Sequence, residues 1–216
     1  MGVGTQPVFD IYENAGGGYT SMRRTNPNNS PDSPFFPTAN DYGCFGWTLD
    51  PEDILTAAQT LTTGTLQGSL LVVPNNCTAN RLSAAFATVQ GAETNFNGVG
   101  LYSVDSGVTT LTKVAASANQ TWTAASTTAI TDAPFTAATP ITPGYYWAVI
   151  LGSTSGTAAT IHGATAVSSG AVNFSKNSGV TAFRSFTFGS GLTALPATIS
   201  LAGVTKSAFT PFLALS

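Results

Sequence analysis

The sequence contains a single histidine, His162, so most acid–base and nucleophilic chemistry would depend on that one side chain. A Ser-His-Asp or Cys-His site needs its imidazole within hydrogen-bond reach of its partners. His162 lies in the stretch AATIHGATA, which has no flanking acid or thiol and which we expect to be a strand. A zinc site would have only this imidazole beside Cys44 and Cys77, which are far apart in the sequence. We therefore expect His162 to be structural, and we predict no catalytic residue, no metal ligand and no bound cofactor.

Paired carboxylates are the other route to hydrolysis, because a glycosidase needs two of them facing each other across a cleft. After residue 53 the only acids are Glu93, Asp105 and Asp132, and Asp105 lies in a predicted turn. The sequence has no G-x-S-x-G, Walker or dinucleotide-binding motif. We predict that the protein is not an enzyme. A hydrolase that uses His162 or the Asp105/Asp132 pair is the alternative.

Four aromatic residues offer a different chemistry, the stacking of rings on sugars: Tyr102, Trp122, Tyr145 and Trp147. Rings of this size also dominate the buried area of protein cores. The simpler expectation is that they fill the core, and a carbohydrate-binding surface is the alternative. For Cys44 and Cys77 we expect two buried thiols, since isolated cysteines usually behave as small hydrophobes, although a disulfide between them stays open.

The charge of the sequence excludes two classes of partner. Charged residues make up 8% of the chain, against about 25% in an average globular protein. The net charge is −3, and residues 1–53 carry seven acids against Arg23 and Arg24, which gives −5 there and +2 in the remainder. The basic residues of that remainder are scattered and form no stripe that could neutralise phosphates. We therefore expect no nucleic-acid partner and no membrane partner, and we expect synthesis in the cytoplasm, because no secretory signal or membrane-spanning run is present.

These residues must be positioned mainly by strands, because the chain is rich in Thr, Ser, Ala and Gly and poor in strong helix formers. Short extended runs separated by turn residues are typical of an antiparallel sandwich or barrel. We predict strands near 66–73, 79–89, 97–104, 108–115, 126–131, 144–151, 158–167, 182–188, 196–201 and 207–214.

The run PGYYWAVILG at 143–152 lacks a polar face. A strand with one side in water should alternate apolar and polar residues. We therefore expect one face of this strand to pack on the opposite sheet. We expect the other face to pack on a neighbouring element, which is either an aromatic N-terminal arm or an adjacent subunit.

Two segments are predicted along the chain. Residues 1–47 form an irregular arm, rich in Pro, Gly and aromatic residues, which would lie on a partner or on its own domain. Residues 48–216 form the β-domain, with one short helix near 51–58. The helix is indicated by Asp50 as N-cap and Pro51 at the first helical position.

Three stretches together carry a family resemblance: GTLQGSLLVVP, NFNGVGLYSVDSGVTTLTKVAASANQTW and ATPITPGYYWAVIL. The pattern is a strand that ends in Pro74, a Gly-Leu-Tyr strand at 100–102, a turn, a second strand, Trp122, and a Gly-Tyr-Tyr strand at 144–146. It resembles the jelly-roll β-sandwich of virion proteins of tailed phages of actinobacteria, often called minor tail proteins. The resemblance covers about residues 60–152.

This resemblance implies an all-β, jelly-roll-like antiparallel sandwich and a structural role. The expected function is that of a non-enzymatic virion protein of the tail, of minor tail or fibre type, with the arm docked on the particle and the sandwich projecting. A capsid (head) decoration protein that stabilises the shell is the first alternative, and a carbohydrate-binding host-attachment module is the second. The implied location is the virion, assembled in the host cytoplasm. The implied partners are other virion proteins, contacted through the arm, and further copies of the chain, which could form a trimer. In the second alternative the partner is a host cell-surface glycan.

Overall fold

The computed structural model describes residue 39 and residues 43–49, 55–88, 95–122, 130–165 and 184–216. The chain divides into two compact units, Met1–Cys44 and Phe45–Ser216. The predicted arm therefore lies almost wholly outside the described residues. The division falls slightly before the predicted one, because Gly46 and Trp47 pair with the C-terminal strand and belong to the second unit.

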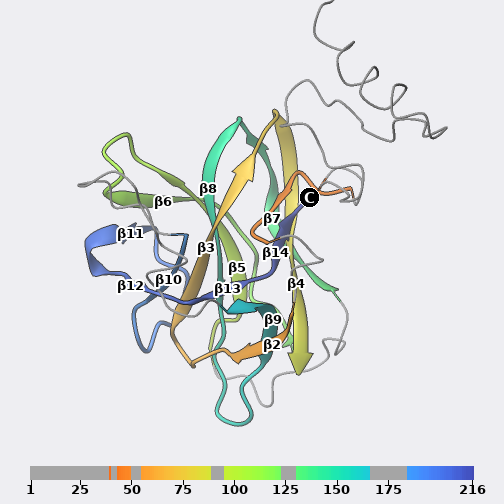
Figure 1. Cartoon of the computed structure of the whole chain (residues 1–216), viewed down its shortest axis with the longest axis vertical. Helices are drawn as coiled ribbons and strands as arrows, with labels where there is room; N and C mark the ends of the chain where they lie inside the picture. The colour runs from red at the N-terminus through yellow and green to blue at the C-terminus, as the bar shows by residue number, and fades with distance from the viewer. Residues whose placement is uncertain (1–38, 40–42, 50–54, 89–94, 123–129, 166–183) are drawn as a thin grey trace, which may run out of the picture. The chain divides into compact units, whose positions relative to one another are not determined.

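The second unit is an antiparallel β-sandwich whose two principal sheets each have four long strands (Figure 1). Sheet one has the order β2 (Leu55–Thr60), β9 (Thr160–Thr165), β4 (Cys77–Thr88) and β7 (Ile130–Ile141). Sheet two has the order β3 (Leu66–Val73), β8 (Gly144–Leu151), β5 (Gly98–Val104) and β6 (Thr110–Ala116). Along the sequence the chain alternates between the sheets except at the β5–β6 hairpin. This is the double Greek-key connectivity of a jelly roll.

Short strands lengthen sheet two at both edges. On one side β3 pairs with β10 (Ser185–Phe188), which pairs with β12 (Thr205–Lys206). On the other side β6 pairs with β11 (Thr198–Ser200), which leads into the 3-10 helix η4 (Leu201–Gly203). The segment from β10 to β12 thus reaches across the whole width of sheet two.

The C-terminal segment lies between β9 and β4 in sheet one, where those two strands separate. Its first half, β13 (Phe209–Pro211), pairs with β9, and its second half, β14 (Leu213–Leu215), pairs with β4. The other side of β14 pairs with β1 (Gly46–Trp47). The two ends of the second unit therefore meet in one sheet.

The principal core lies between the sheets and follows the alternation of the strands. Sheet two contributes Leu71, Val73, Val99, Leu101, Tyr146, Ala148 and Ile150. Sheet one contributes Leu82, Ala84, Phe86, Ala133, Phe135, Ile161, Phe209, Leu213 and Leu215. This core closes the sandwich, since burial of apolar area is the dominant favourable term in folding.

The sandwich was predicted correctly, but two local predictions were wrong. Residues 55–60 are strand β2 rather than part of a helix at 51–58, because pairing with β9 outweighs a local capping pattern in a segment too short to form a stable helix; residues 51–54 lie outside the described part. The strand predicted to end at 131 continues as β7 from Ile130 to Ile141, while residues 126–129 of that prediction lie outside the described part. Pairing with β4 holds β7 extended through Pro134 and Pro140.

Candidate functional site

The outer face of sheet two explains why strand β8 is apolar on both sides. Tyr146, Ala148 and Ile150 point into the core between the sheets. Trp147, Val149 and Leu151 belong instead to a second buried cluster. The remaining members of this cluster are Leu66, Tyr102, Leu111, Phe186, Leu195, Ile199 and Leu201. Among the described residues, the element that covers β8 is the chain's own segment 186–204, whereas the sequence had suggested the arm or an adjacent subunit.

Hydrogen bonds fix this cover to the sheet. The hydroxyl of Tyr102 donates to the carbonyl oxygen of Pro196 at 2.6 Å, and Lys113 Nζ donates to the carbonyl oxygen of Leu195 at 3.0 Å. Burial raises the pKa of the Tyr102 phenol well above its usual value, so this donor stays protonated at every physiological pH. The two bonds hold the 195–196 segment against β5 and β6.

Gly68 makes room for the ring of Phe186. The two residues are opposite each other in the β3–β10 pairing, and a Cβ atom at position 68 would lie 2.5 Å from Phe186 Cζ. Since real Cβ atoms do not approach a neighbour so closely, any larger residue would displace the ring. The missing side chain is thus part of how the cover fits.

Among the described residues, no element covers one end of the outer face. Val72 and Tyr145 are cross-strand neighbours in β3 and β8, and their exposed fractions are 50% and 64%. Leu70 and Val104 lie beside them on the same face, half-buried against the second cluster. We call these four residues the open strip. An apolar area that a monomer leaves in water is a candidate contact surface.

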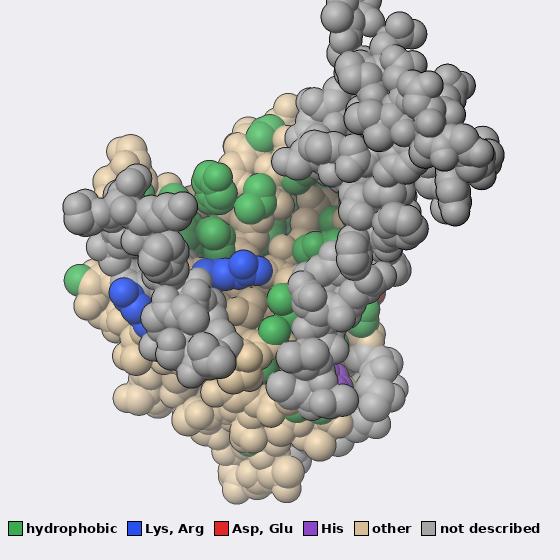
Figure 2. Space-filling view, viewed as in Figure 1, with side chains coloured by type: hydrophobic (Ala, Val, Ile, Leu, Met, Phe, Trp, Pro, Cys, Tyr) green, Lys and Arg blue, Asp and Glu red, His purple; other side chains and the backbone are tan. Residues whose placement is uncertain are grey.

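A positive charge borders the open strip. The carbonyl oxygen of Arg184 accepts a hydrogen bond from Leu70 N at 2.7 Å, and its exposed side chain donates from Nη2 to the carbonyl oxygen of Thr48 at 3.5 Å. Hydrophobic side chains gather beside Lys and Arg side chains on this face of the molecule (Figure 2).

Three of the four rings considered for sugar stacking are buried. Tyr102, Trp122 and Trp147 expose 0%, 2% and 4% of their surface, and the ring of Trp122 packs against Phe86 with centroids 5.2 Å apart. The expectation that these rings fill the core is confirmed. Only Tyr145 presents its ring to solvent, as part of the open strip.

His162 lies in β9 as expected, and its carbonyl oxygen accepts a hydrogen bond from Phe212 N of the C-terminal segment. Its Nδ1 atom is buried and has no hydrogen-bond partner among the described residues. Within the same described part of the chain, no three His, Cys, Asp or Glu side chains gather closely enough to hold a metal ion.

The two acids considered for hydrolysis lie in different sheets and have structural partners. Asp105 is in the β5–β6 hairpin, where its carboxylate accepts hydrogen bonds from the Thr109 hydroxyl, from Thr109 N at 2.6 Å and from Thr110 N at 3.1 Å. These bonds lower the pKa of Asp105, with the Thr109 hydroxyl contributing most. They also support Val108, whose φ of +53° is unusual for a β-branched residue.

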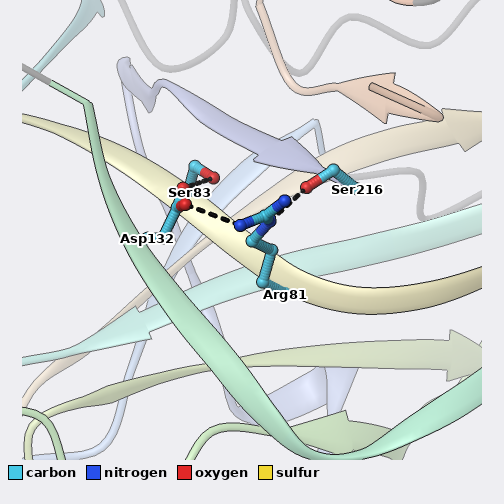
Figure 3. Close-up of polar contacts among 4 residues, drawn as sticks. All are labelled: Arg81, Ser83, Asp132 and Ser216. Carbon is cyan, nitrogen blue, oxygen red and sulfur yellow. Dashed lines mark hydrogen bonds and ion pairs between the residues drawn. The ribbon is translucent and has the colours of Figure 1, made fainter. Parts of the chain in front are cut away.

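Asp132 belongs to a polar cluster around the C-terminal strand (Figure 3). Its carboxylate accepts hydrogen bonds from Arg81 Nη1 at 2.9 Å and from Ser83 Oγ at 2.6 Å. Arg81 Nε also donates to Ser216 Oγ at 3.0 Å, and the backbone of Ser216 bonds to Asn80 and Arg81. No imidazole takes part, so Ser83 lacks the base that a serine nucleophile needs. The cluster ties β4, β7 and the end of β14 together.

Both cysteines are thiols, as expected, but each is half-buried rather than buried. Cys77 is half-buried against the principal core. Burial raises its pKa, and because the thiolate is the reactive form, its reactivity is reduced.

No protein-family model matches the sequence, and no curated protein matches it either. Among the described residues, no helix has the length and apolar composition needed to cross a membrane. Sequence reasoning missed the strip as a unit. Its signal was the pairing of an apolar residue, Val72, with the first tyrosine of the Tyr-Tyr-Trp run.

Proposed function

We propose that this protein is a non-enzymatic structural component of a tailed-phage virion, associated with the tail as a minor tail or fibre-type protein. Residues 1–44 would dock on the particle, and the sandwich would project from it. The observation that carries the proposal is the jelly-roll connectivity of the second unit. This architecture recurs in viral capsid domains, and the sequence resemblance to minor tail proteins points in the same direction.

The use of the ionisable side chains supports a structural role. Asp105 holds a hairpin, and Arg81 with Asp132 holds the C-terminal strand. Catalysis by acids and bases needs such groups in a cleft with room for a substrate. Here the described acids satisfy backbone and side-chain donors of the fold itself.

The surface supports assembly with other copies. A chain with few charges and an apolar strip at one end of a sheet face resembles proteins whose surfaces are shared with neighbours. Closed symmetric homo-oligomers are the usual form of such assemblies. A trimer is one such form.

Mass spectrometry of purified particles, with absolute copy counting, tests this proposal. We expect the chain in the particle at a few to tens of copies. Hundreds of copies would replace the tail assignment with the alternative of a head decoration protein. Absence of the chain from infectious particles would overturn the proposal in both forms.

The role of the N-terminal unit needs a separate experiment. A chain that begins at Phe45 should remain soluble and β-rich but should not enter particles when it is the only version present. A matched control with residues 1–44 in place and Ile130→Ser on β7 should enter normally. Normal incorporation of the shortened chain would contradict docking through this unit.

A further inference from the structure

Sheet one is incomplete without the segment 209–215, which contains β13 and β14. Direct pairing between β4 and β9 is limited to Phe86 with Ile161 and Thr88 with Thr160. Beyond these positions the two strands separate, and the gap between them is filled by β13, which pairs with β9, and by β14, which pairs with β4. The segment therefore occupies a gap whose two sides are formed by strands from earlier parts of the chain.

The gap holds this segment by apolar burial and by a fixed register. Leu213 and Leu215 expose none of their surface and Phe209 exposes 4%, and all three belong to the principal core. Thr48 Oγ1 donates to the carbonyl oxygen of Pro211 at 2.6 Å and accepts a hydrogen bond from Leu213 N at 2.9 Å. These contacts determine which residue of the segment lies at each position of the gap, so the gap is specific for this sequence.

A very short connection joins the segment to the preceding strand. β12 ends at Lys206 in sheet two, and β13 begins at Phe209 in sheet one. Ser207 and Ala208 therefore cross between the sheets by themselves. Ser207 N donates to the carbonyl oxygen of Ser185 at 3.0 Å, and Ser207 Oγ accepts a hydrogen bond from Phe209 N at 3.0 Å. Short hinges of this kind promote the exchange of the element that they carry between copies, whereas longer hinges let it fold back on its own copy.

We propose that copies of this chain join by exchanging the segment 209–215, so that β13 and β14 of one copy fill the gap between β4 and β9 of another. The segment makes the same contacts in the exchanged and the unexchanged form, so exchange costs no buried area and is decided by the hinge and by the concentration of copies. The inference rests on the proposed function, because a virion component present in several copies has neighbours at high local concentration. Each sandwich is then completed by a neighbouring copy.

Disulfide formation between two variants of the full chain tests the exchange. Ser83 in β4 and Ala214 in β14 are cross-strand partners, and such partners have Cα atoms about 4.5–5.5 Å apart, within the range that a disulfide spans. Chains with Ser83→Cys and chains with Ala214→Cys are produced together in equal amounts, purified and oxidised. Trypsin places position 83 in peptide 82–113 and position 214 in peptide 207–216, apart from both native cysteines in peptide 25–81.

We expect peptides 82–113 and 207–216 to be linked at about half of the thiols at position 83, because random mixing of copies offers an Ala214→Cys segment to about half of the gaps. Each chain carries one of the two substitutions, so the link requires two copies. Both positions are buried, which prevents the link from forming by collision of folded surfaces. The double variant Ser83→Cys/Ala214→Cys is the control and should link fully. A link in the double variant without one in the mixture would show that each segment stays in its own copy, and would overturn the proposal.

Sedimentation velocity of hinge variants supplies an independent readout. Insertion of Gly-Gly-Ser between Ser207 and Ala208 lengthens the hinge, so the segment can fold back on its own copy. We expect this insertion to raise the dissociation constant of the oligomer by at least about tenfold, whereas the same insertion between Gly156 and Thr157, in an exposed turn, should not. Circular dichroism checks that each variant is folded. A monomeric wild type, or unchanged assembly of the folded hinge variant, would contradict the exchange whatever the disulfide result.

Neither measurement involves the particle, so failure of the exchange leaves the proposed function to be decided by copy counting in purified particles. Absence of the chain from particles would remove the proposed function and leave the exchange as a property of the purified protein. The two outcomes are therefore distinguishable.

Discussion

The packing of the second buried cluster, on the outer face of sheet two, depends on the absence of a side chain at Gly68. We expect Gly68→Ala to destabilise the protein by about 1–3 kcal/mol, because the new methyl group would push the Phe186 ring out of a well-packed site. Urea denaturation measures the change. Gly107→Ala is the matched control, since a Cβ there would make only ordinary contacts at 3.6 Å or more. Equal stability of the two variants would mean that the ring moves without cost.

Asp105 makes the stability of the β5–β6 hairpin depend on pH. Hydrogen bonds from Thr109 and Thr110 lower the pKa of its carboxyl in the folded state, below the unfolded value of about 3.9. The stabilisation it provides is therefore complete above that value and is lost as the pH falls through the folded pKa. We expect the difference in unfolding free energy between wild type and Asp105→Ala to be constant from pH 8 to 5 and to shrink below pH 4.

Denaturant titrations at pH 7 and pH 2.5 measure this difference. Asp105→Asn is the control, because an amide keeps an acceptor oxygen but does not titrate. The stability of Asp105→Asn relative to Asp105→Ala should not vary between the two pH values. A wild-type advantage that is as large at pH 2.5 as at pH 7 would contradict the role of the carboxylate.

The C-terminal strand has two means of attachment, which differ in strength. Leu213 is fully buried in the principal core, and we expect Leu213→Ala to cost about 2–5 kcal/mol. The Arg81 and Asp132 side chains are about half exposed, and such pairs contribute about 0–1 kcal/mol, so Arg81→Ala should cost less than Leu213→Ala. Urea midpoints compare the two variants. A larger loss for Arg81→Ala would show that the polar cluster, rather than apolar burial, anchors the strand.

The elements differ in how far they could be predicted. Strands 66–73 and 144–151 were predicted with the bounds that the structure has, because their apolar runs end at Pro74, Gly144 and Gly152. Strand β2 was mistaken for a helix because Asp50 and Pro51 are local signals, whereas its pairing with β9 is a contact about 100 residues away. Local patterns do not contain such contacts.

The cover of sheet two could have been inferred from the sequence in part. A strand that is apolar on both faces requires a covering element, and Leu192, Leu195, Ile199 and Leu201 recur at short intervals after it. The covering role was assigned to the arm or a neighbouring subunit, because the strands predicted at 182–188 and 196–201 gave no sign of the sheet face on which they lie. Only the register of β10 on β3 and of β11 on β6 places those leucines over β8.

The boundary of the sandwich predicts how the whole chain tolerates shortening. A chain that begins at Phe45 keeps β1, whereas one that begins at Thr48 loses its pairing with β14 and the Phe45 contact with the core. We expect the first to melt within about 1 °C of the full chain, and the second to melt lower by about 2–4 °C for each kcal/mol lost. Differential scanning calorimetry measures both. Identical melting of the two would mean that residues 45–47 contribute nothing to the sandwich.

The segment that covers β8 is synthesised after β8, which leaves the outer face of β8 without its cover for a time during translation. About 50 residues separate Leu151, at the end of β8, from Leu201, the last large residue that shields its outer face. At roughly 5–20 residues per second, a ribosome needs on the order of 3–10 s to make them. During that interval Trp147 and Val149 lack their covering segment on every nascent chain, so high-level production should depend on chaperone supply and improve at a slower rate of expression.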